Sequence, residues 1–431
     1  MKTEIIEEDS KKDIYKSSRV LYWIECAFEY LINILCGGAF LAKLTGAVGI
    51  SDGMTAIMTS IVSFAALAQF ASIYISHRAP VKRFVIPIMF ISHALMAGMF
   101  LLPFIGGGGT VAAIFFITFL VARFMVSSIA AVKVTWFFNL VPDNKRGAFA
   151  AIANGSSLVA GTVFSLVAGF VIDEFEAAGN LEGAFLTLSL CILAFAAINF
   201  LTLLFSKEKP YANSSDKKEK ISESFKSLLK NKNYMGLFVV QVLVSVAGGI
   251  AMPFFGTYQI NELGFTVTFV AIITAIQSMV KLLSVTVFGK ISLNKSHRSI
   301  ILTALPLIGL SYFIAIFTAP QNGSVLYPIF IIVFYIGLGG YNVSDTNILL
   351  ATVPEAQQTS ALSLNAAASG VITFFTTVAA SPLIEFMQSR GNEIFGFTVY
   401  AQQILSVFAS LLYFAAAICM KALVKTSENR T

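Results

Sequence analysis

The sequence predicts an all-α polytopic membrane protein with twelve transmembrane helices, arranged as two pseudo-symmetric six-helix bundles. Three observations lead to this prediction. Hydrophobic residues make up 57% of the 431 residues and charged residues only 12%, about half the ~25% of a soluble domain. The apolar residues fall into runs of about 18 or more, long enough to cross a hydrocarbon core of ~30 Å. The second half of the chain also repeats features of the first.

The apolar runs define twelve expected spans. They lie at about 20–44, 53–75, 84–103, 110–138, 147–172, 184–205, 234–258, 265–287, 299–318, 326–349, 359–384 and 397–420. Most linkers between them are short, and the exception is 206–232, which carries eight Lys and is typical of a solvated segment on the membrane surface. We therefore expect a first bundle over 1–205, a basic cytoplasmic linker over 206–232 and a second bundle over 233–431.

The basic charge is distributed unequally between the two sides of the membrane. Loops on the same side as both termini hold 24 of the 29 Lys and Arg residues, whereas the other side holds only Lys43 and Arg390. Positive residues concentrate in cytoplasmic loops, so we expect both termini in the cytoplasm of a plasma membrane of the bacterial inner type. The pI of 9.0 is then a consequence of topology, and no nucleic-acid partner is expected.

A shift of 212 residues superimposes the two halves of the sequence. LVPDNKRGA at 140–148 meets TVPEAQQTS at 352–360, in each case after the fourth span of a set of six. The same shift aligns two ladders of small residues, Ser157, Gly161, Ser165 and Gly169 with Ser369, Thr373, Thr377 and Ser381. Small residues at every fourth position allow helices to pack closely in lipid. The coincidence predicts two parallel bundles about a pseudo-two-fold axis normal to the membrane.

With this duplication and its basic central loop, the chain resembles the major facilitator superfamily over nearly its whole length. Three loops add to the resemblance: ASIYISHRAPVKR (71–83) after span two, DNKRG (143–147) after span four and FGKISLNKSHR (288–298) after span eight. The resemblance implies a secondary transporter that works by alternating access, with its substrate bound near mid-membrane between the bundles. It also implies that spans one and four line the cavity of the first bundle.

Six charged residues lie inside the expected spans, and they define the candidate ion-pair sites. They are Glu25, Glu29 and Asp345 against Arg123, Lys133 and Lys281. An uncompensated charge in lipid costs at least ~2.5–3.5 kcal/mol, so such residues usually face a cavity and pair. Glu29 and Arg123 lie near mid-membrane, and an acid–Arg pair at spans one and four resembles the proton-coupling site of some sugar symporters. We expect Glu29 to load and release the proton beside Arg123; a purely structural ion pair is the alternative.

Lys133 and Asp345 occupy equivalent positions under the 212-residue shift. A pseudo-two-fold axis places them at the same depth on opposite sides of the cavity, so they are candidates for an ion pair that closes the cytoplasmic gate. The competing pairings lie within the bundles, Lys133 with Glu25 and Lys281 with Asp345. Candidate substrate ligands are the polar span residues Gln241, Asn342, Tyr341, Gln277 and Asn154, for each of which a helix–helix hydrogen bond is the alternative.

No motif of an enzyme is present: the sequence has no HExxH, no GxSxG, no P-loop and no metal-ligand cluster of Cys or His. We therefore expect neither an enzyme nor a metal or cofactor site, and an ion or solute gradient as the energy source. The predicted function is proton-coupled uptake of a small polar organic solute, such as a sugar, by a monomer in the bilayer. Two alternatives stay open, a drug/proton antiporter and a non-transporting membrane receptor with the same fold.

Overall fold

The computed structural model describes residues 14–69, 80–142, 145–209, 227–228 and 230–424, and nearly all of them are helical. The first half consists of α2 (Lys16–Leu35), α3 (Gly38–Val48), α4 (Asp52–Ala65), α6 (Lys82–Met99), α7 (Gly109–Phe138), α8 (Arg146–Ala177) and α9 (Leu181–Phe205). Short 3₁₀ turns follow α4 at Ala66–Gln69 and α6 at Leu102–Ile105. Helices satisfy every backbone hydrogen bond within one segment, which is what a chain in lipid requires.

The second half consists of α11 (Lys232–Ala251), α12 (Phe255–Thr257), α13 (Val267–Ile291), α14 (His297–Ala315), α15 (Gly323–Thr352), α16 (Glu355–Ser389) and α17 (Ala401–Leu423). A 3₁₀ turn at Met252–Phe254 precedes α12, and a π-helical turn at Tyr258–Glu262 follows it. Between α16 and α17 the strands β1 (Glu393–Ile394) and β2 (Phe397–Thr398) form an antiparallel hairpin. The described residues thus form an all-α polytopic membrane fold with one small hairpin.

Ten helices in the described part of the chain are long and apolar enough to span a membrane, and α2 with α3 forms an eleventh that is bent by 45°. The second expected span is present as α4, 14 residues long, and its continuation beyond Gln69 lies outside the described residues. The basic loop residues 71–79, with Arg78, and most of the 206–232 linker are outside them as well.

The structure corrects two of the expected spans, the first and the twelfth, and shows an irregular turn within the seventh. The first, expected to be continuous over 20–44, breaks after Leu35, where Gly38 adopts a positive φ of 52°. The seventh, expected over 234–258, is present as one span over Lys232–Glu262; a 3₁₀ turn at Met252–Phe254 interrupts its α-helical pattern, because Pro253 has no N–H to continue the helical ladder. The twelfth, expected from 397, begins at Ala401, since Phe397–Thr398 pairs as a strand. The first span of each half is therefore irregular: that of the first half is bent by 45°, and that of the second contains a 3₁₀ turn and a π-helical turn.

The two ladders of small residues pack equivalent helix pairs in the two halves. In α8, a Cβ at Gly161 would lie 2.3 Å from the Tyr30 ring of α2, so only glycine permits this approach. In α16, Thr377 donates to the Gly249 carbonyl of α11 at 2.8 Å. The fifth span of each half thus packs closely on the first, as small residues allow in lipid.

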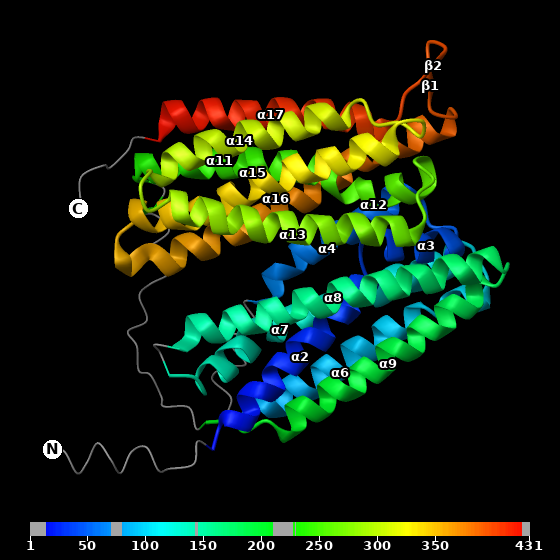
Figure 1. The fold of residues 1–431 in the computed structure, drawn as a ribbon, viewed down its shortest axis with the longest axis horizontal. Coiled ribbons are helices and arrows are strands. Elements are labelled where there is room, and N and C mark those ends of the chain that lie inside the picture. The colour runs from blue at the N-terminus through cyan, green and yellow to red at the C-terminus, as the bar shows by residue number, and fades with distance from the viewer. Residues whose placement is uncertain (1–13, 70–79, 143–144, 210–226, 229, 425–431) are drawn as a thin grey trace.

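We define two ends of the molecule. The terminal side holds the start of α2 and the end of α17, and the opposite side holds α3, α12 and the hairpin (Figure 1). Between described residues, every side-chain hydrogen bond that joins the two halves lies toward the opposite side. These bonds are Ser51 to Glu385, Asn261 and Gln388 to Asp52, and Val267 and Thr268 to Asp173. The helices of the two halves lie apart toward the terminal side in Figure 1.

Candidate functional site

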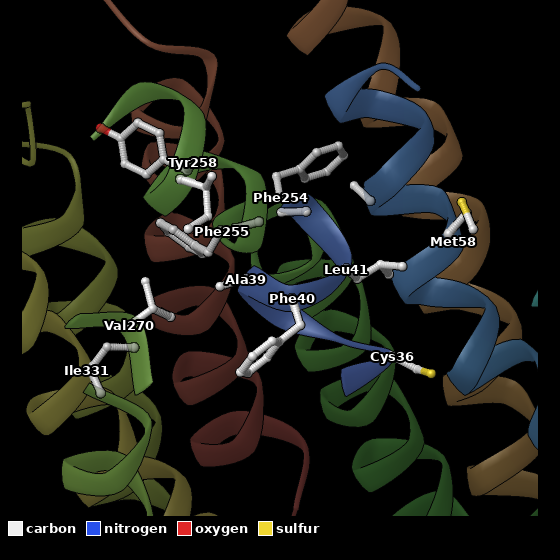
Figure 2. Close-up of a cluster of buried hydrophobic side chains, with 14 of the residues drawn as sticks. Cys36, Ala39, Phe40, Leu41, Met58, Phe254, Phe255, Tyr258, Val270 and Ile331 are labelled. Carbon is white, nitrogen blue, oxygen red and sulfur yellow. The ribbon is translucent and has the colours of Figure 1, made fainter. Parts of the chain in front are cut away.

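The candidate site is a cavity of about 310 Å³ between the two halves, at the level where the first span of each half is irregular. Its wall includes Gly37 and Gly38 at the break between α2 and α3. From the second half it includes Met252, in the 3₁₀ turn before α12, and Phe255 and Gly256 of α12. Figure 2 shows the α3 segment with Ala39 and Phe40 lying beside Phe254 and Phe255 of the second half. Breaks in membrane helices are tolerated where they line a cavity and are typical of transporter binding sites.

The backbones of these two irregular spans come into close contact beside this cavity. A Cβ at Gly256 of α12 would lie 3.1 Å from the carbonyl oxygen of Gly38. A side chain at position 256 would therefore push α12 away from α3. The glycine allows the two irregular segments to meet on the opposite side of the cavity and helps to close it there.

The polar part of the cavity wall consists of neutral side chains from both halves. They are Asn33, Ser165, Gln259, Thr274, Gln277 and Tyr327. Gln259 donates from Nε2 to the Tyr327 hydroxyl, which fixes the direction of both groups. The wall thus presents three amides and three hydroxyls, groups that both donate and accept hydrogen bonds. Phe40 and Phe255 supply aromatic surface to the same wall.

A buried charged cluster lies on α2 and α7, on the terminal side of the cavity. Lys133 Nζ donates to Glu25 Oε1 at 2.8 Å and also to Glu29 Oε2. The Glu25 side chain is fully buried, whereas that of Glu29 is 19% exposed. Glu25, Glu29 and Asn33 follow one another at intervals of four residues, so α2 presents them on one face. The face that holds the charges therefore continues into the cavity.

Arg123, expected beside Glu29, has other partners in this structure. Its guanidinium donates to Asn33 Oδ1 and, at 3.0 Å, to the carbonyl oxygen of Cys36. Cys36 is the C-cap of α2, and the last carbonyls of a helix have no partner within it. Arg123 therefore caps the broken end of α2, where a cation is favoured by the helix dipole. Glu29 pairs with Lys133 instead.

Of the three competing ion pairs, the structure contains the one between Lys133 and Glu25. The cross-bundle pair of Lys133 with Asp345 is not formed in this conformation. Lys281 is exposed, and among the described residues neither it nor Asp345 forms a salt bridge. Lys281 follows Gln277 by one turn of α13. It therefore lies on the same face of that helix, on the terminal side of the cavity.

The other predicted substrate ligands differ in their positions. Gln277 lines the cavity. Tyr341 donates from its hydroxyl to Gln241 Oε1 at 2.7 Å, a hydrogen bond between α15 and α11. Asn154 and Asn342 are exposed on α8 and α15 and do not line this cavity. The structure therefore brings one of the five predicted ligands into the cavity.

Sequence reasoning missed most of the cavity wall. Asn33 carried a signal, because it continues the four-residue spacing of Glu25 and Glu29. Gln259 lies in a π-helical turn, a feature frequent at functional sites, but nothing in the sequence marks that turn. Tyr327 and Thr274 lie on apolar spans without any distinguishing pattern, and only the tertiary contacts bring them to the cavity.

Two helical halves that enclose a cavity lined by residues of both are typical of membrane transporters. Residues 26–377 match the family described as the Major Facilitator Superfamily, and the chain belongs to that family. Membership of this family identifies a transporter and not an enzyme. Among curated protein sequences, none matches the chain.

Solved structures with the same fold cover nearly the whole chain at low sequence identity. A variant of the nucleoside transporter NupG has a TM-score of 0.74 at 14% identity, over 95% of this chain and 100% of that one. A D-xylose–proton symporter has a TM-score of 0.70 at 13% identity, over 96% and 99%. The Escherichia coli fucose:proton symporter FucP has a TM-score of 0.56 at 13% identity, over 96% and 98%. These similarities show the fold.

Proposed function

We propose that this protein takes up a small polar organic solute, such as a sugar, coupled to protons and by alternating access. The observation that carries the proposal is the cavity wall, with its three amides and three hydroxyls from both halves. A ligand rich in hydroxyl groups pairs with such a wall, because each amide and hydroxyl both donates and accepts. A site that hydrogen-bonds hydroxyls also rejects analogues that lack them, since its buried polar groups would stay unpaired.

The same wall argues against an amphipathic drug as substrate. A drug-binding cavity would be lined mainly by phenylalanine, whereas this wall combines Phe40 and Phe255 with six polar residues and with aliphatic ones such as Ile34, Val270 and Ile331. The similar structures support the preference, since two of them are sugar–proton symporters and a third is a nucleoside transporter by name.

Proton coupling is proposed for Glu29, with Lys133 as its partner in this conformation. Two carboxylates contact one ammonium group, so the cluster carries one negative charge in excess when both are ionised. A proton on Glu29 removes this excess and weakens its attraction to Lys133. Glu29 is the carboxylate that is partly exposed and lies one turn from Asn33 in the cavity wall. Protonation and the occupancy of the cavity can therefore influence each other through α2.

We further propose that the terminal side is cytoplasmic, so that this conformation faces inward. The inequality of basic residues supports the orientation, and the contacts between the halves on the opposite side support a closed exterior. In this proposal the protein is a monomer. Its two bundles, 1–205 and 233–431, rock against each other about the cavity and are joined by the linker 206–232. Lys133 and Asp345 then approach each other only when the terminal side closes.

The substrate class can be tested with purified protein and a thermal-stability screen across sugars, nucleosides, organic acids and amphipathic drugs. A ligand that binds only the folded state at 100 times its Kd stabilises it by about 2.7 kcal/mol. We expect polyhydroxyl solutes to raise Tm, and Gln277→Ala to abolish the rise. Thr286→Ala, an exposed position on the same helix, is the matched control. A rise with drugs alone would identify the antiporter, and no rise with any class would favour a receptor.

Coupling can be tested with Glu29→Gln in proteoliposomes. We expect proton-driven accumulation of the solute to be lost, while exchange of solute down its own gradient persists. Accumulation by a folded Glu29→Gln protein would show that another group carries the proton.

A further inference from the structure

The hairpin between α16 and α17 has an unusual tip. β1 pairs with β2 through Glu393 with Thr398 and Ile394 with Phe397. Phe395 and Gly396 connect the strands, with φ values of 50° and 80°. Positive φ at both central residues is the geometry of a type I′ turn, which strongly favours Asn-Gly or Asp-Gly. A phenylalanine at the first of these positions is a genuine outlier in backbone conformation.

Nothing within the described chain offsets this strain. The Phe395 side chain is 97% exposed, the highest value among the large hydrophobic residues described, and Phe397 is 73% exposed. Strained backbone conformations cluster at functional sites, so an observed outlier motivates a functional hypothesis. Two aromatic side chains held away from the protein indicate that their contacts lie outside it.

The direction of the hairpin indicates what those contacts are. Figure 1 shows the hairpin projecting sideways past α17, at the level where the helices end on the opposite side. α16 and α17 run through the membrane, so an element that leaves them sideways at their ends extends over the neighbouring lipid. Its tip then lies at the boundary between headgroups and acyl chains on that side.

The residues around the hairpin are of the types that favour this boundary. Arg390, between the end of α16 and the hairpin, lies over the ring of Phe386 at 4.4 Å, and Phe386 is itself 50% exposed. Amphipathic and aromatic side chains anchor membrane proteins at the interface, with basic groups turned toward the lipid phosphates. The base of the hairpin carries one exposed cation, Arg390, and one exposed anion, Glu393, so the preference for a phospholipid surface over water rests on the exposed rings of Phe395 and Phe397.

We propose that residues 393–398 form an interfacial anchor, which inserts Phe395 and Phe397 into the leaflet on the opposite side while Arg390 contacts a lipid phosphate. The base of the anchor is connected to the contact between the halves. Asn392 Nδ2 donates to Glu262 at 3.0 Å, and Gln388 donates both to Glu262 and to Asp52 of the first half. The leaflet thereby holds the part of the second half that closes the opposite side. The anchor is independent of the solute transported.

The test uses full-length Phe395→Trp protein in phosphatidylcholine–phosphatidylglycerol vesicles, with the signal of wild-type Trp23 and Trp136 subtracted. Bromine atoms on the acyl chain, placed either near the headgroup or near the chain end, quench tryptophan at the corresponding depth. We expect Phe395→Trp to be quenched most by bromine near the headgroup. Phe408→Trp, a half-exposed position within α17, is the control that should respond more to deep bromine.

A second variant separates anchoring from the folding of the hairpin. Phe395→Asn installs a residue that type I′ turns prefer, so the turn remains while the anchor is removed. With Phe397→Trp as the reporter, we expect Phe395→Asn to abolish quenching by shallow bromine. Quenching of Phe395→Trp by aqueous iodide alone, with no effect of brominated lipid, would overturn the proposal. Equal quenching of Phe397→Trp with and without Phe395→Asn would also overturn it.

Discussion

Asp173 forms the most direct of the contacts that close the opposite side. Its two carboxylate oxygens accept the Val267 and Thr268 backbone N–H groups at 2.9 and 2.8 Å, so α8 of the first half caps the N-terminus of α13 in the second. One turn earlier, a Cβ at Gly169 would lie 3.1 Å from the backbone of the same two residues. Asp173→Ala removes both hydrogen bonds and should shift the protein toward a conformation open on the opposite side.

The size of the shift follows from the contact. A hydrogen bond to a charged group contributes about 1.5–3 kcal/mol, and a carboxylate at a helix N-terminus about 0.3–1 kcal/mol, or up to ~2 kcal/mol when partly buried. Water solvates the carboxylate and the N–H groups once the halves separate, so we take about 2 kcal/mol as the net bias. Since about 1.4 kcal/mol changes an equilibrium tenfold, the conformational ratio should change about 30-fold.

The assay is a distance distribution between spin labels at Ala177 and Gln321, exposed positions on the two halves at the opposite side. Asp173→Ala should increase the population at longer distance. Asp173→Asn keeps one acceptor oxygen and should have a smaller effect. Glu174→Ala, an exposed neighbour, should have none. If Asp173→Ala and Glu174→Ala give the same distribution, the cap does not bias the conformations and the reasoning is refuted.

Three further predictions concern the charged cluster, the helix contact and the topology. Lys133→Met leaves buried Glu25 without its cation and should lower the free energy of unfolding by about 3–5 kcal/mol. The double variant Lys133→Met with Glu25→Gln should recover part of the loss in Tm, and equal Tm values for the single and the double variant would contradict this. Gly370→Ala places a Cβ 2.4 Å from a backbone oxygen of α4 and should open the opposite side in the spin-label assay, whereas Gly155→Ala, with no atom within 4 Å, should not. A cysteine at Leu293, 82% exposed between α13 and α14, should react with an impermeant reagent only in permeabilised cells, and labelling of intact cells would place the terminal side outside.

The pairing of the charges inside the membrane could not be predicted from the sequence alone. The rise of ~1.5 Å per residue places Glu29 and Arg123 at similar depth, and on depth alone they pair. The structure instead pairs Glu29 with Lys133. Depth along an axis is a property of the sequence, whereas the tilt and rotation of α2 and α7 are set by packing against their neighbours. Arg123 also donates a hydrogen bond to the Cys36 carbonyl at the end of α2, an acceptor that the sequence did not predict.

The sequence by itself determined the class of the protein. Long uncharged apolar runs have few structural options, because only helices or closed barrels satisfy the backbone in lipid. The 212-residue repeat likewise predicted which helices are equivalent, since duplicated ladders of small residues pack in the same way. Only the tertiary structure decided the composition of the cavity. Gln259, Tyr327 and Thr274 line the cavity from different helical segments. The irregular turns and tilts that bring them together arise when the two halves pack against each other, so no local sequence pattern predicts their proximity.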